Sequence, residues 1–69
     1  MTKEKLIAEY KQKISSCDTR IESFSNSIRQ ARKNEEDQDV IFDIIFERRI
    51  EQTQRQAYLQ FIKDLEELS

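Results

Sequence analysis

A short group of polar residues in the second half of the chain is the best candidate for chemistry. Arg48, Gln52 and Arg55 are four and three residues apart, so they share one face of a helix, and Arg49 directly follows Arg48. Guanidinium groups bind phosphate in a bidentate manner. In a symmetric dimer, two copies each of Arg48 and Arg55 would place four guanidinium groups around one axis. Arg48, Arg49, Gln52 and Arg55 are therefore a candidate anion-binding site, for a nucleotide or for structured RNA.

A structural interpretation of the same residues is preferred here. They form the middle of a stripe that is nearly the same in both directions, with apolar ends, arginines inside them and a glutamine at the centre. A two-fold antiparallel contact between identical helices requires such symmetry, and a polar layer in it sets the register. A third interpretation is that these residues lie on a solvent-exposed helix face and that their symmetric spacing arose by chance. The predicted oligomer or partner seam consists of Ile41, Ile45, Arg48, Gln52, Arg55, Leu59 and Ile62.

Other chemistry has little support in this composition. The chain has no His and no Gly, so it lacks the usual base near neutral pH and the usual phosphate-cradling loop. A single Cys cannot form a disulfide within the chain, and zinc sites normally need more Cys or His. The acidic residues at 35–39 do not have the spacing of a calcium loop, so we assign them to helix capping and solubility. We expect no enzyme, no catalytic residue, no cofactor and no metal.

Two apolar ladders predict the elements that carry these residues. Both have the three- and four-residue steps of a helix packed along a partner helix. Matched antiparallel, their members pair one to one, with Phe24 opposite Ile50 and Cys17 opposite Ala57, so Cys17 is expected to be a small buried hydrophobe. The first ladder is Ile7, Tyr10, Ile14, Cys17, Ile21, Phe24, Ile28 and Ala31. The second ladder is Phe42, Phe46, Ile50, Thr53, Ala57, Phe61, Leu65 and Leu68.

The ladders predict an all-α, coiled-coil-like antiparallel hairpin in one domain, residues 1–69. Helix one is expected over about 3–33 with Thr2 as N-cap, the turn over 34–38, and helix two over about 39–68. Asn34 is expected to adopt a left-handed C-cap, and Asp37 or Asp39 to cap helix two. The weak helix formers at 15–19 allow a break there. We prefer one helix, because the ladder crosses them without a change of phase.

A lone hairpin of 69 residues buries little apolar surface against a chain-entropy cost of about 1.5 kcal/mol per residue. We therefore predict that two hairpins pair as a homodimer, a four-helix bundle. The apolar segment Val40–Phe46 then packs on the dimer mate or docks another protein. This general shape resembles Rop-type RNA-binding dimers, small helical chaperones of secretion systems and small phage-encoded inhibitors. The resemblance is one of architecture, with no shared motif.

Charge is unevenly divided along the chain. Residues 1–33 carry eight basic and four acidic groups, and residues 34–69 carry four and ten. We interpret this as charge balance between the two helices rather than as a nucleic-acid strip, because phosphate-backbone binding usually needs a strong basic excess. No apolar run approaches the ~20 residues of a membrane span, and the start does not resemble a signal peptide, so we expect no membrane partner and a cytoplasmic location.

Two hypotheses about function follow from these patterns. The first is a non-enzymatic interaction module, an adaptor, chaperone or inhibitor, that binds another macromolecule, most simply a protein, as a homodimer. The second is the binder of a phosphate-bearing ligand described above.

Overall fold

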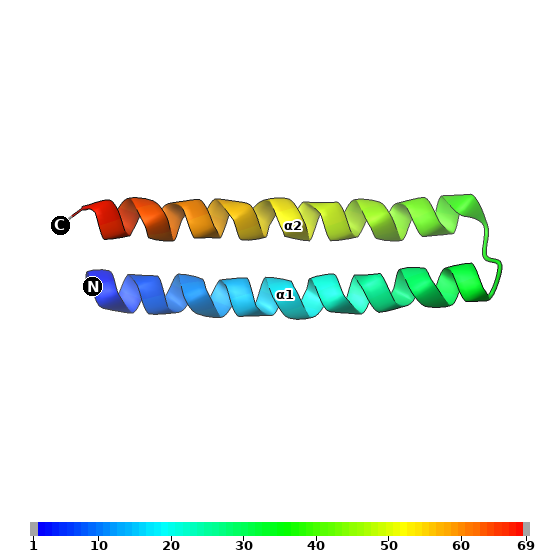
Figure 1. Cartoon of the computed structure of the whole chain (residues 1–69), viewed down its shortest axis with the longest axis horizontal. Coiled ribbons are helices and arrows are strands. Elements are labelled where there is room, and N and C mark those ends of the chain that lie inside the picture. The colour runs from blue at the N-terminus through cyan, green and yellow to red at the C-terminus, as the bar shows by residue number, and fades with distance from the viewer. Residues whose placement is uncertain (1, 69) are drawn as a thin grey trace.

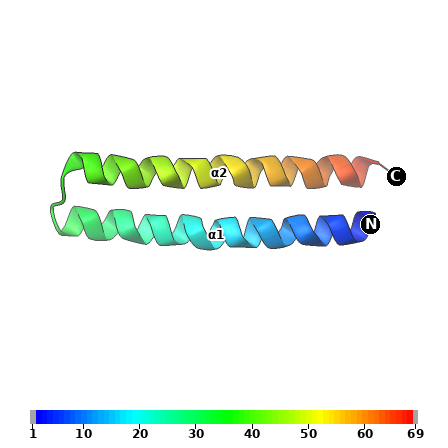
Figure 2. The same cartoon turned by 180° about the vertical axis from the view of Figure 1, so that it is seen from behind.

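The computed structural model describes residues 2–68. It consists of two α-helices, α1 (Lys3–Lys33) and α2 (Gln38–Glu67), which run antiparallel and side by side along their whole length (Figures 1 and 2). The hairpin measures 52 by 14 by 14 Å. At its open end the Lys3 ammonium donates a hydrogen bond to the carbonyl of Leu68 over 3.1 Å. The all-α antiparallel hairpin predicted from the ladders is confirmed.

Helix α1 begins and continues as its sequence predicts. The hydroxyl of Thr2 accepts a hydrogen bond from the Lys5 amide at 3.2 Å, which confirms the N-cap. The helix does not break at residues 15–19. There the Thr19 hydroxyl donates to the Ser15 carbonyl at 3.2 Å, a bond made within one continuous helix.

The turn differs from the prediction by one residue. Asn34 has φ −86°, and Glu35, with φ 55°, takes the left-handed position instead. The amides of Glu35 and Glu36 bond to the carbonyls of Arg32 and Ala31, at 3.2 and 2.9 Å. This is the Schellman arrangement, in which the left-handed residue lies one position beyond the C-cap. Asp37 is the N-cap residue of α2 but makes no side-chain capping bond.

The predicted inner face of α1 is confirmed, since all eight members of the first ladder are buried or half-buried. Cys17 is completely enclosed. A core cluster near the turn joins Ile28 and Ala31 to Ile41, with Ile44 and Ile45 packed against it. Towards the open end, the Tyr10 ring packs on aromatic rings of α2 at centroid distances of 4.5 and 5.4 Å.

The predicted inner face of α2 is wrong. Phe42, Phe46 and Ile50 were expected inside the hairpin, but they are 59%, 65% and 47% exposed. Ile50 therefore does not pack inside opposite Phe24, and Thr53 and Ala57 are exposed too. Only Leu65 of the second ladder is half-buried. The residues of α2 that are buried or half-buried are Ile41, Ile44, Ile45, Arg48, Glu51, Arg55, Tyr58, Ile62 and Leu65.

Residues 2–68 lack two features that would point to a particular function. Neither helix is long and apolar enough to span a bilayer. No group of three or more His, Cys, Asp or Glu side chains in this part of the chain is arranged to hold a metal ion.

Candidate functional site

A layer of polar contacts in the middle of the hairpin explains which side of α2 faces α1. The guanidinium Nε of Arg20 donates to both carboxylate oxygens of Glu51, at 2.6 and 2.9 Å. Arg48 donates to the Ser25 hydroxyl at 3.2 Å. Because Glu51 is only 9% exposed, its charge needs a partner inside the protein, and α1 supplies one.

A second ion pair lies beside this layer. Arg55 donates through Nε to the Asp18 carboxylate at 2.5 Å, and both side chains are partly exposed. Each of these contacts joins a polar side chain of α2 to a polar side chain of α1, so the polar middle of α2 lies against α1. The hydrogen bond to Glu51 raises the pKa of Arg20 above its ordinary value, so Arg20 stays charged at every physiological pH.

The ion pair between Arg20 and Glu51 predicts an asymmetric mutational effect. Arg20→Ala leaves a buried carboxylate without a partner, whereas Glu51→Ala leaves an arginine that is already half in water. We expect Arg20→Ala to lower the urea midpoint of unfolding more than Glu51→Ala does. Asp18→Ala is the control. We expect it to lower the free energy of unfolding by about 0.5 kcal/mol, because the ion pair between Asp18 and Arg55 is partly exposed. Equal losses in the first two variants would show that Glu51 does not depend on Arg20.

The predicted oligomer seam lies mostly inside the hairpin. Ile41 and Ile62 are buried, and Ile45, Arg48 and Arg55 are half-buried. The expectation that the hairpin leaves this stripe unused is therefore wrong. Gln52 and Leu59 are its exposed members. Self-association itself remains a prediction, and it needs a different surface.

The four candidate anion-binding residues are not brought to one place. Arg48 and Arg55 hold groups of α1, and the carboxylate of Asp18 beside Arg55 disfavours an anion. Gln52 and Arg55 line one shallow groove of about 370 Å³, and Gln52 and Arg49 line another of about 240 Å³. Anion binding remains a prediction, and this arrangement does not favour it.

A thermal-shift series tests the anion hypothesis. We expect millimolar phosphate and nucleotides at low salt to leave the melting temperature unchanged, because two of the three arginines are already engaged. Sodium chloride at the same ionic strength is the control. A rise specific to phosphate, and lost in Arg49→Ala, would contradict this expectation.

The outer side of α2 carries an apolar surface, which we call the outer stripe. Its members were identified from the sequence but placed inside. Phe46 lies two residues from both Ile44 and Arg48, about 200° around the helix from each, and so points away from α1. Phe46, Ile50 and Ala57 line a groove of about 360 Å³. The outer stripe consists of Phe42, Phe46, Ile50, Thr53, Ala57 and Phe61.

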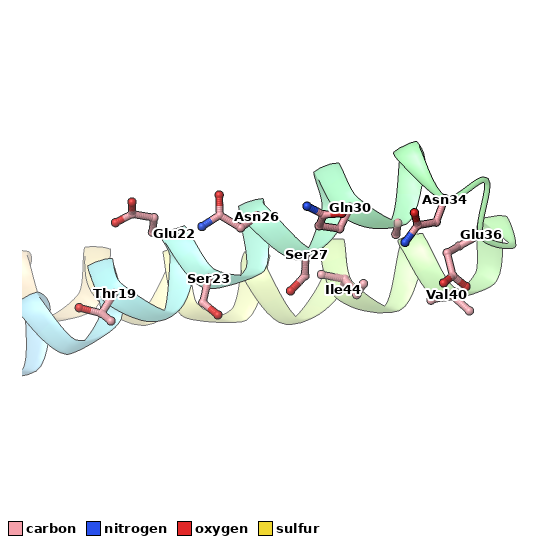
Figure 3. A pocket seen from close by; sticks show the side chains of 11 residues that line it. Thr19, Glu22, Ser23, Asn26, Ser27, Gln30, Asn34, Glu36, Val40 and Ile44 are labelled. Carbon is pink, nitrogen blue, oxygen red and sulfur yellow. The ribbon is translucent and has the colours of Figure 1, made fainter.

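A further groove lies between the helices near the turn, and the sequence did not reveal it. Its volume is about 580 Å³. Figure 3 shows Val40 and Ile44 of α2 beside a row of hydroxyl and amide side chains of α1. The only signal in the sequence is the three- and four-residue spacing of those small polar side chains. We call this surface the turn-end groove. It is lined by Thr19, Glu22, Ser23, Asn26, Ser27, Gln30, Ala31, Asn34, Glu36, Val40 and Ile44.

Comparisons with family models, with curated proteins and with solved structures find no match for this chain. The fold therefore defines its class, an antiparallel two-helix hairpin. The surfaces described above carry the argument about function.

Proposed function

We propose that this protein is a non-enzymatic interaction module that acts as a homodimer and binds another macromolecule, as an adaptor, chaperone or inhibitor. The observation that carries this proposal is the outer stripe. Three large apolar side chains in line, Phe42, Phe46 and Ile50, are each about half exposed or more. Soluble monomers rarely leave such a surface in water, and contiguous apolar patches usually mark contact sites.

The distribution of polar groups supports the same conclusion. Most charged residues at the middle of the hairpin make contacts between the helices, as Arg20 and Glu51 do. The outer stripe is where the described chain offers a large apolar area, and the turn-end groove offers amides and hydroxyls around Val40 and Ile44. The first surface suits helix packing, and the second suits hydrogen bonding to a peptide segment.

A pair of matched double variants tests the proposal. Phe46→Gln with Ile50→Gln removes the centre of the outer stripe without a change of charge. Gln12→Ala with Ser16→Ala changes two exposed positions of α1 and is the control. We expect the first variant, and not the second, to lose both self-association by light scattering and the capture of proteins from the native host's extract. Unaltered mass and unaltered capture in the first variant would overturn the proposal.

A further inference from the structure

We propose that a second copy of this chain covers the outer stripe, with α2 packed antiparallel on α2 about a two-fold axis. This inference rests on the proposed function and names the surface and arrangement of the homodimer. The stripe lies on the side of α2 that faces away from α1. The two α2 helices therefore form the middle of the dimer, and the two α1 helices lie outside.

The two helices differ in a way that favours such an arrangement. Within residues 2–68, every large hydrophobic residue that is clearly exposed belongs to the segment from Val40 to Leu68, and α1 contributes none. Helix α2 thus carries apolar side chains on two sides, for example Ile41 towards α1 and Phe42 towards water, which are 6% and 59% exposed. A helix that is apolar on two sides is normally covered on both.

The spacing of the outer stripe fits a two-fold antiparallel contact. Its steps are four, four, three, four and four residues, the same in both directions. When two copies of such a stripe are antiparallel, each of its residues faces a stripe residue of the other copy, as an isologous interface requires. A parallel contact would place Thr53 and Ala57 against their equals, between the bulky pairs of Ile50 and of Phe61, and would leave a gap there. The antiparallel pairs are Phe42 with Phe61, Phe46 with Ala57, and Ile50 with Thr53.

The charges beside the middle of the stripe are compatible with this register. On one flank Glu47 lies nearest Gln54 of the other copy, and on the opposite flank Arg49 lies nearest Gln56. Each pair joins a charge to an amide, which can hydrogen-bond to either sign. The middle of the contact therefore contains no facing like charges.

The exposed apolar area supplies about two-thirds of what a small stable dimer interface needs. Taking about 200 Å² for a complete residue of this size, the exposures of Phe42, Phe46, Ile50 and Phe61 correspond to roughly 400 Å² per copy. Two copies bring about 800 Å² from these residues alone. The flanking Arg49 and Gln54 add to this and bring the contact towards the ~1,200 Å² of small stable interfaces. Val40 and Ile44 are not part of the stripe, so each copy keeps its turn-end groove.

Engineered cysteines test the register. In a Cys17→Ala background, checked for helix content by circular dichroism, Phe46→Cys and Ala57→Cys are made singly and together. In the proposed dimer residue 46 of one copy faces residue 57 of the other, so mild oxidation converts the double variant into a covalent dimer. Each single variant stays largely uncrosslinked, because its own two copies of the cysteine are about 16 Å apart along the axis. One chain has a mass of 8.3 kDa, and light scattering of the unaltered protein should give twice that mass.

The outcomes separate this inference from the proposed function. Crosslinking of Phe46→Cys alone indicates a parallel contact and overturns the arrangement. A monomeric mass with no crosslink in any variant overturns self-pairing. The proposed binding of another macromolecule then still stands, without the homodimer, if Phe46→Gln with Ile50→Gln loses capture of other proteins, and it fails if that variant captures them as before.

Discussion

Ile41→Asp abolishes folding of the hairpin, whereas Phe42→Asp prevents its self-association and leaves far more helix than Ile41→Asp does. This is the expected result with the largest contrast, because neighbouring residues lie on different faces. Ile41 is 6% exposed within the core cluster, and a carboxylate there costs on the order of 4 kcal/mol. That is about the whole stability of a domain of this size.

Phe42 is the internal control for this experiment. It is 59% exposed, so its replacement removes little packing within one chain. We expect the free energy of unfolding of that chain to fall by about 0.5 kcal/mol. Both positions lie near the start of α2, so an added carboxylate interacts equally well with the helix dipole in either variant. Circular dichroism reports the helix content and light scattering reports the mass. If Phe42→Asp unfolds the chain and Ile41→Asp does not, the two faces of α2 have been assigned the wrong way round.

Ile28→Ala is expected to lower the free energy of unfolding by about 2–4 kcal/mol. Ile28 is 3% exposed and belongs, with Ala31 and Ile41, to the core cluster near the turn. The rigid helices on both sides cannot close fully around the missing methyl groups, so a cavity adds to the lost transfer free energy.

Urea unfolding at one fixed protein concentration measures this loss, because the stability of an associating chain depends on concentration. Gln30→Ala, two residues away and exposed, is the matched variant and is expected to change the free energy by less than about 0.5 kcal/mol. Similar shifts in both variants would mean that the contact near the turn does not hold the helices together.

The candidate site was only partly accessible from the sequence. The periodicity identified both apolar faces of α2 and assigned each to the wrong neighbour. The second ladder was placed inside because its members pair one to one with those of the first ladder when the two are matched antiparallel. That argument omitted the cost of leaving Glu51 without Arg20. The turn-end groove was missed because it depends on side chains from both helices.

The sequence by itself determined two helices, their ends to within one residue, their antiparallel order and the inner face of α1. Helix α1 has a single apolar stripe, so periodicity left no choice there. Helix α2 has two, and only the tertiary structure decided between them. The physical reason is that the decision depends on pairs such as Arg20 with Glu51 and Arg48 with Ser25, whose members are distant in the chain and are absent from any local pattern.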